Sequence, residues 1–95
     1  MNQYEVLYII DPTLEEEATK AVIERFNKLI ADNGAKVTDI DEWGKRRLAY
    51  EINDLNEGYY VLLHMEAAPE FPSELERNFQ ISENIMRYLV TRVGE

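Results

Sequence analysis

The residues best suited to chemistry gather in one stretch of the sequence, Gly-Lys-Arg-Arg-Leu-Ala-Tyr. Lys45, Arg46 and Arg47 are three of only ten basic residues in a chain whose formal net charge is −9. Arginine presents a planar fork of donors that matches a phosphate group. This basic run is therefore a candidate docking point for an anion. The alternative is a solvated bend whose charges pair locally with Asp41 or Glu42.

The other reactive side chains argue against catalysis. His64 is the single histidine and the chain has no cysteine, so a histidine–cysteine ligand set or nucleophile pair is excluded. Glu15, Glu16 and Glu17 are consecutive on an expected helix, so they fan around its axis and do not converge on a cation. The sequence also has no glycine-rich phosphate loop. We expect no enzyme, no metal and no cofactor, and we place His64 on a contact surface.

Two aromatic residues flank the basic run and could stack on nucleic-acid bases, because every base offers a π-face. Tyr50 is in phase with Leu48 and Ile52, which favours a place in the core. Trp43 lies beside the bend, and the sequence leaves both places open for it.

The elements that position these residues follow from the spacing of apolar side chains. Apolar residues on both faces predict central strands at residues 3–10 and 59–66. Helical spacing predicts a helix that runs to Asp32, with a Thr13–Glu16 capping box at its start and Asn33-Gly34 as its stop.

The rest of the chain completes the order of elements. Residues 36–53 form a long extended stretch in which Gly44 marks a bulge or a bend, and a polar connection follows it. Residues 73–80 form a second helix and residues 85–93 the last strand. We predict one domain over residues 1–95. Its fold class is α+β, a ferredoxin-like βαββαβ sandwich with a four-stranded antiparallel sheet and two helices on one face.

One face of this sheet is then left uncovered by helices. Leu48, Tyr50 and Ile52 of the second strand are expected to point to the helices. An uncovered face with an apolar centre and arginines at its margins predicts a contact surface. Its expected members are Glu5, Leu7 and Ile9; Arg47, Ala49 and Glu51; Tyr60, Leu62 and His64; and Arg87, Leu89 and Thr91.

The net charge and the N-terminal residues limit the possible partners and the cellular location. The acidic total argues against indiscriminate binding to nucleic acid, but it leaves room for a local basic site because charges act over ~8–10 Å. The N-terminal residues lack the basic region and cleavage site of a signal peptide, and no apolar run approaches the ~20 residues of a membrane span. We therefore expect a cytoplasmic location.

From “YEVLYIIDP” to “IMRYLVTR”, and most densely in “WGKRRLAYEI” followed by “GYY”, the sequence resembles the small-subunit ribosomal protein six family of bacteria. The resemblance implies a structural, ribosome-associated protein. It also implies a heterodimer with ribosomal protein eighteen of the same subunit, which binds the central domain of small-subunit ribosomal RNA and supports platform assembly.

The resemblance also implies roles for individual residues. RNA contacts are expected at Lys45, Arg46, Arg47 and Arg87. Partner packing is expected at Tyr60 and Leu62, together with their open-face neighbours Leu7, His64 and Leu89.

Other readings of the same topology remain. A small-molecule regulatory module of this fold is the main alternative, and it would show homodimerisation and a stabilising ligand. A phosphate-cradling hydrolase would need a basic loop after the first strand, where this chain has Asp-Pro-Thr-Leu-Glu-Glu-Glu. The base-stacking signature of RNA-recognition motifs is matched only at Gly58, Tyr59 and loosely Leu62.

Overall fold

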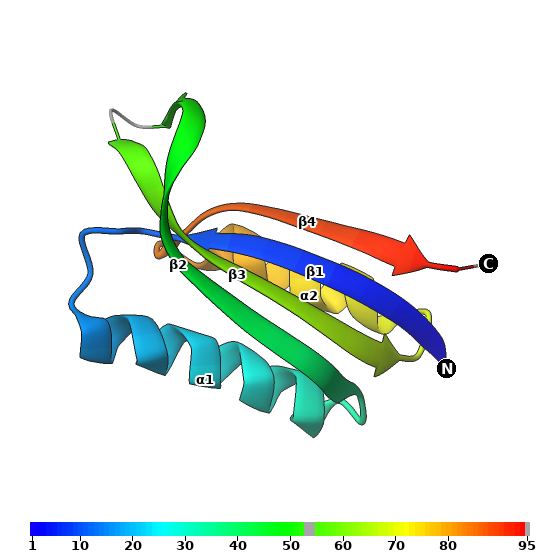
Figure 1. Ribbon diagram of the computed structural model, residues 1–95. Helices are drawn as coiled ribbons and strands as arrows, with labels where there is room; N and C mark the ends of the chain where they lie inside the picture. Colours follow the sequence, from blue (N-terminus) through cyan, green and yellow to red (C-terminus); the bar gives the residue numbers. More distant parts are fainter. Residues whose placement is uncertain (53–54, 95) are drawn as a thin grey trace.

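The order of elements is the predicted one. The computed structural model describes residues 1–52 and 55–94, and of residues 49–52, 55 and 56 it describes the backbone alone. Within these residues six elements follow one another (Figure 1): β1 (Asn2–Ile10), α1 (Glu16–Asp32), β2 (Lys36–Ile52), β3 (Leu55–Ala67), α2 (Phe71–Ile81) and β4 (Ile85–Val93).

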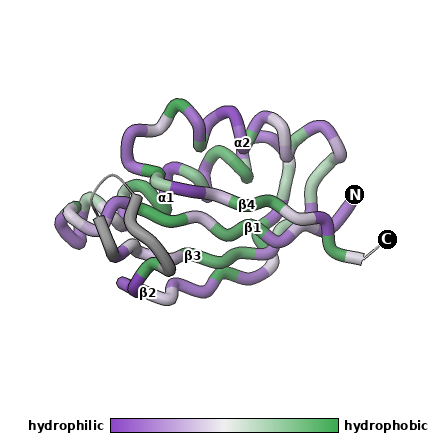
Figure 2. Tube along the Cα trace, turned by 90° about the horizontal axis from the view of Figure 1, so that it is seen from above, coloured by the Kyte–Doolittle hydropathy of each residue, from purple (hydrophilic) through white to green (hydrophobic). Residues whose placement is uncertain are grey.

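The strands of the described chain form one four-stranded antiparallel sheet in the order β2-β3-β1-β4. The two strands that are apolar on both faces, β1 and β3, lie in the centre, as predicted. Val6 of β1 is the partner of Leu63 on one side and of Val90 on the other. In Figure 2 the central strands carry long apolar stretches, whereas the edge strand β2 is mostly hydrophilic. The ferredoxin-like arrangement is thus confirmed.

The core lies on one face of the sheet, under both helices. Tyr8 of β1 contacts Phe26 of α1 and Phe79 of α2, with ring centroids 5.6 and 5.1 Å away. Phe26 and Phe79 also touch one another at 4.6 Å. The remaining members are alternate residues of the central strands, the inward positions of the helices and Ala35: Tyr4, Val6, Ile10, Val61, Leu63, Met65, Ala67, Val22, Ile23, Ile30, Phe71, Leu75 and Ala35.

The start of α1 differs from the prediction. The N-cap is Glu15, and its side chain makes no capping hydrogen bond. Thr13 turns away from the helix, because its backbone N–H and its hydroxyl both donate to Asp11 Oδ1, at 2.8 and 2.7 Å. The Thr13–Glu16 capping box is therefore wrong. An Asp-Pro-Thr turn satisfies the threonine locally before the helix begins.

The end of α1 follows the prediction. Gly34 has a φ of 76°, in the left-handed region that glycine enters without penalty. Its N–H donates to Ala31 O, and the N–H of Ala35 donates to Ile30 O. These two bonds form a Schellman motif, which satisfies the last carbonyls of the helix.

Two other boundaries differ from expectation by a few residues. α2 begins at Phe71 and includes Pro72 in its first turn, where proline's missing N–H costs nothing. β3 begins at Leu55 and not at residue 59, so part of the expected polar connection is strand. Arg46 and Arg47 of β2 pair there with Gly58 and Glu57. The apolar pattern missed this segment because it carries few apolar residues.

The β2–β3 hairpin extends beyond the rest of the sheet (Figure 1). Gly44 has a φ of 79°, and the register shifts between Glu42 and Gly44, which confirms the predicted bulge. The bulge also changes the face of the sheet to which the following residues of β2 point. Leu48 is buried, but it lies beside Ile9 and Gly58 on the open-face side and outside the main core, so its predicted place under the helices is wrong.

The same shift moves the basic run. Arg46, and not Arg47, pairs with Gly58 and shares the side of the strand from which Tyr60 projects. Arg47 pairs with Glu57, on the alternate side. The placing of Arg47 in the open-face series is therefore wrong, because one extra residue in a strand exchanges the two faces. The predicted side-chain directions of Ala49, Tyr50, Glu51 and Ile52 lie outside the described residues.

Candidate functional site

The bulge at Gly44 divides the basic run between two sides of the hairpin. Lys45 is the cross-strand partner of Tyr59 and lines a hollow against α1 together with Leu14 and Lys20. Arg46 points to the open-face side. Because neighbouring strand residues alternate in direction, three consecutive cations here cannot act as a single patch.

Arg46 and Arg47 nevertheless reach one hollow. An open depression of ≈ 630 Å³ is lined by both arginines and by Asp41, Glu42, Trp43 and Tyr60. It lies where the bulge of β2 meets β3, at the base of the projecting hairpin. The strong twist that bulges impose on a strand accounts for the meeting of two side chains that start on alternate sides.

The basic run does not form the local ion pairs with Asp41 or Glu42 that a solvated bend would show. Among residues 1–48 and 57–94, whose side chains are described, none of the three basic residues lies within 4 Å of a carboxylate. The two acids that were available have other partners. Trp43 Nε1 donates to Asp41 Oδ2 at 2.9 Å, and the hydroxyl of Tyr59 donates to Glu42 Oε1 at 3.1 Å. Neutral donors thus orient both carboxylates, and the three basic residues make no ion pair with the described side chains.

Partial burial and the hydrogen bond to Glu42 raise the pKa of Tyr59 above its usual value. Tyr59 therefore keeps its proton throughout the physiological range and serves as the donor to Glu42.

Trp43, which the sequence left undecided, is on the surface. Its side chain is 39% exposed, and its ring stacks on Tyr60 with centroids 6.0 Å apart and an angle of 13° between the planes. Tyr60 itself is half-buried on the open face, where the sequence placed it.

A second hollow on the open face is apolar. It measures ≈ 250 Å³ and is lined by Leu7, Ile9, Arg87, Tyr88 and Leu89. Leu89 is 61% exposed, which is unusual for a large apolar side chain. Three of the predicted site residues therefore come together here. Arg87, predicted as an RNA contact, lies among predicted partner contacts and not beside the basic run.

Beyond these two hollows, toward the start of β1, the open face carries charge. Leu62 lies at the centre, half-buried, opposite Leu7 of β1 and Asp41 of β2. Next to it on β3, His64 Nε2 lies 3.1 Å from Glu5 Oε2 and His64 Nδ1 lies 4.0 Å from Asp39 Oδ2. The predicted surface position of His64 is confirmed, and its neighbours are acids from both flanking strands.

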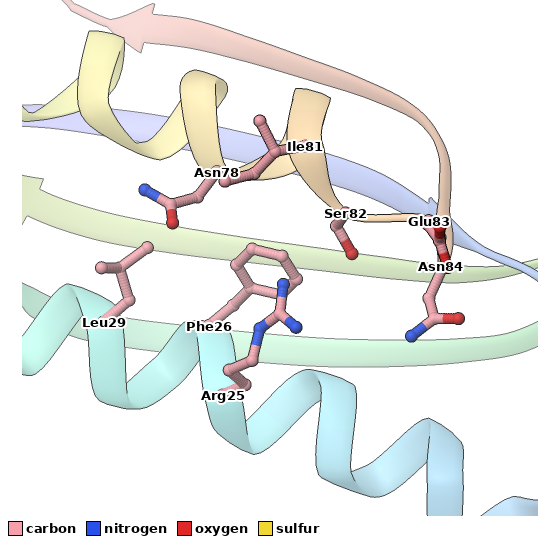
Figure 3. A pocket seen from close by; sticks show the side chains of 8 residues that line it. All are labelled: Arg25, Phe26, Leu29, Asn78, Ile81, Ser82, Glu83 and Asn84. Carbon is pink, nitrogen blue, oxygen red and sulfur yellow. The ribbon is translucent and has the colours of Figure 1, made fainter.

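A further hollow lies away from these residues, between the helices. Its volume is ≈ 580 Å³, and Figure 3 shows side chains from α1, α2 and the following turn converging on it. Arg25 lies over the ring of Phe26, 5.1 Å from its centroid. None of the predicted site residues reaches this hollow, whose lining is Arg25, Phe26, Leu29, Asn78, Ile81, Ser82, Glu83 and Asn84.

The described part of the chain shows neither a metal-binding cluster nor a membrane-spanning helix. Across it, no three histidine, cysteine or acidic side chains are grouped closely enough to hold a metal ion. Neither described helix has the length and apolar character needed to cross a membrane.

Sequence reasoning missed two features of the site. Ile9 was placed on the open face, but its burial beside Leu48 and Gly58 was not foreseen, because that contact joins residues far apart in the chain. The Trp43–Tyr60 stack was also missed. The signal that could have found it is the Gly44 bulge, because a bulge redirects the neighbouring side chain.

Comparison with known proteins identifies the family. A family model described as ribosomal protein S6 matches residues 3–92. Small ribosomal subunit protein bS6 of Clostridium novyi (strain NT) is 53% identical over 90 residues, covering 95% of each chain. Its counterpart in Moorella thermoacetica is 50% identical over 95 residues, covering 100% of this chain and 97% of the relative.

The fold agrees with a solved structure of the same kind. The crystal structure of 30S ribosomal protein S6 from Thermotoga maritima matches with a TM-score of 0.91 at 30% identity, covering 96% of this chain and 86% of that chain. The family model and the relatives each span nearly the full sequence. The chain therefore belongs to the ribosomal protein S6 family of the bacterial small ribosomal subunit.

Proposed function

We propose that this protein binds the central domain of small-subunit ribosomal RNA as a heterodimer with ribosomal protein eighteen, and that it supports assembly of the platform. Membership of the S6 family makes the chain a structural component of the bacterial small subunit and not an enzyme. It also makes the chain cytoplasmic and ribosome-associated. The proposal concerns the RNA region, the protein partner and the residues that contact them.

The observation that carries the RNA part is the pair Arg46 and Arg47. Both side chains are exposed at one hollow and have no carboxylate partner among the described side chains, in a chain with a net charge of −9. Exposed arginines that make no ion pair keep their planar fork of donors free for an external anion. A phosphate backbone supplies that anion, and it positions the protein without reading sequence.

The partner part rests on the rest of the open face. The apolar hollow at Leu7 and Leu89 offers contact area, and Leu62 and Tyr60 continue it across β3. Acids lie at the end of this face near the start of β1, where Glu5 of β1 and Asp39 of β2 flank His64. A small basic protein complements both properties, because it buries apolar side chains and neutralises the acids. Arg87 would then lie at the partner boundary.

Neutralisation by the partner also explains how an acidic chain approaches RNA. Most of the free energy of non-specific RNA binding comes from release of counterions at neutralised phosphates. The chain alone offers only two arginines in this hollow, so it gains little free energy from counterion release. Lys45, on the α1 side of the hairpin, would add a phosphate contact from a different direction.

Charge reversal of the two arginines tests the proposal. The complex of this chain with ribosomal protein eighteen, carrying Arg46→Glu and Arg47→Glu, would be titrated with an RNA fragment of the central domain at several salt concentrations. We expect at least a tenfold loss of affinity, and a slope of log K against log salt smaller by about 2, because each lost phosphate contact removes about one unit.

A matched control places the same charge change elsewhere. Arg25→Glu with Arg77→Glu reverses two arginines on the helix side, away from both open-face hollows. This variant should retain affinity and slope. Equal losses in the two double variants would mean that only net charge matters, and unchanged binding by the first would refute the role of Arg46 and Arg47.

A further inference from the structure

We propose that the Trp43–Tyr60 pair is a stacking site for one unpaired RNA base, with Arg46 and Arg47 contacting the phosphates beside it. The inference rests on the proposed RNA-binding function and adds a contact to a base, which phosphate contacts alone do not supply.

The bulge creates the platform. Asp41 pairs with Leu62, and Glu42 pairs with Val61 on the helix side. Gly44 then pairs with Tyr60, so Trp43 is the extra residue. An extra residue in a strand redirects its side chain, and here it brings the indole beside Tyr60 on the open face. The left-handed φ of Gly44 makes this path available to the backbone.

The indole is held in place before any ligand arrives. Tyr60 stacks at 6.0 Å, and Asp41 Oδ2 accepts the indole N–H at 2.9 Å. The ring is still 39% exposed, so it retains surface for another contact. A ring fixed by two contacts loses little conformational entropy when a ligand stacks on it, which favours binding.

The charges in the same hollow fit a nucleotide. Arg46 and Arg47 line it with no carboxylate at ion-pair distance among the described side chains. Asp41 and Glu42 line it too, and they accept hydrogen bonds from Trp43 and Tyr59. An aromatic platform beside exposed arginines is the combination that binds single-stranded nucleic acid, because bases stack and phosphates are neutralised.

A protein partner could also use exposed aromatic and arginine side chains. The position of the site favours RNA. The apolar hollow that suits a protein lies on β1 and β4, whereas Trp43 lies on β2, at the opposite edge of the sheet. The two surfaces meet at Tyr60 of β3, so a base on Trp43 and a protein on β1 and β4 would lie on opposite sides of that residue.

Fluorescence offers a direct test, because Trp43 is the only tryptophan of the chain. The complex with ribosomal protein eighteen would be titrated with the central-domain fragment, and the signal of a Trp43→Phe complex would be subtracted. We expect quenching when RNA is added. A signal that changes only when the partner is added, and not with RNA, would overturn the inference by placing Trp43 in the protein interface.

Affinity provides the second measurement. Trp43→Ala should weaken RNA binding by roughly 5-fold to 100-fold, the usual effect of losing one stacked base, with an unchanged salt slope. Trp43→Phe should retain most of the affinity because it keeps an aromatic face. Ile81→Ala, which removes an exposed apolar side chain on the helix side, should have no effect.

The outcomes separate this inference from the proposed function. If the wild-type complex binds the fragment with a steep salt dependence and Trp43→Ala binds equally well, the stacking site is refuted and the phosphate contacts stand. If the wild-type complex does not bind the fragment, the proposed function fails first. Weaker binding to the partner by Trp43→Ala, with RNA affinity of the formed complex intact, would also refute the stacking site.

Discussion

The two faces of the sheet are built from the same strands but differ in how far their side chains are buried. Under the helices, Tyr8, Phe26 and Phe79 form a closed aromatic cluster. On the other face the apolar residues are only partly covered, and Leu89 is 61% exposed. One face therefore supplies stability and the other is available for contacts, since an exposed apolar surface of this kind lowers its free energy by meeting a partner.

The open face is not uniform. At its hairpin end Ile9 and Leu48 are buried beside Gly58, outside the main core. Gly58 is the cross-strand partner of Arg46, so this small cluster adjoins the basic run. The difference teaches that the open face has a buried part and an exposed part, and mutations can separate them.

The largest expected effect is in the covered face. Phe26→Ala should lower the free energy of unfolding by about 3–5 kcal/mol, because Phe26 is 1% exposed and its removal leaves a cavity between two aromatic rings. Denaturant unfolding measures the loss. Leu89→Ala removes an exposed apolar side chain from the open face and should change stability by less than about 0.5 kcal/mol. Similar losses in the two variants would abolish the distinction between the faces.

The next effect concerns the buried part of the open face, around Gly58. A methyl group at position 58 would collide with Cγ2 of Ile9 and lie 3.4 Å from Leu48 Cδ2. Gly58→Ala should therefore cost about 1–3 kcal/mol through overpacking, measured by denaturant unfolding.

A size-conserving second change tests that cause. Leucine lacks the β-branch that the new methyl group would meet, so Ile9→Leu should restore much of the stability of Gly58→Ala while changing the wild type little. If the double variant is no more stable than Gly58→Ala, the loss comes from the backbone at position 58 and not from Ile9.

The smallest effect is in the centre of the covered face. Tyr8 is fully buried, and its hydroxyl finds no hydrogen-bond partner among the described side chains and backbone. Tyr8→Phe should then leave stability unchanged or raise it by about 1 kcal/mol at neutral pH, since no hydrogen bond is lost. A clear loss of stability at neutral pH would show that the hydroxyl is paired.

The pH dependence of the same variant gives an independent measurement. Burial, and next the negative charge of Glu42, raises the pKa of Tyr8 well above its usual value. The unfolded tyrosine loses its proton near pH 10, whereas the folded one retains it. Tyr8 therefore lowers stability progressively as pH rises above about 10, and not below it. Unfolding experiments between neutral and strongly alkaline pH should show a shallower decline for Tyr8→Phe, while equal slopes would contradict the shift.

The sequence by itself determined the order of elements, the central position of β1 and β3, the Asn33-Gly34 helix stop and the face on which Tyr8 and Tyr60 lie. These depend on periods of 2 and 3.6 residues and on local backbone preferences, which are properties of neighbouring residues. The first residues of β3 are mostly polar, so the apolar pattern did not predict that this strand begins at Leu55.

Only the tertiary structure decided on which face of the sheet the site residues of β2 lie. The extra residue at the Gly44 bulge places Arg46 with Tyr60, moves Leu48 to the side of Ile9 and turns Trp43 onto the open face. These outcomes depend on the register between β2 and β3 and on contacts with β1, which lie far apart in the chain. A shift of one residue exchanges the two faces of a strand, so alternation read along a single strand cannot locate it.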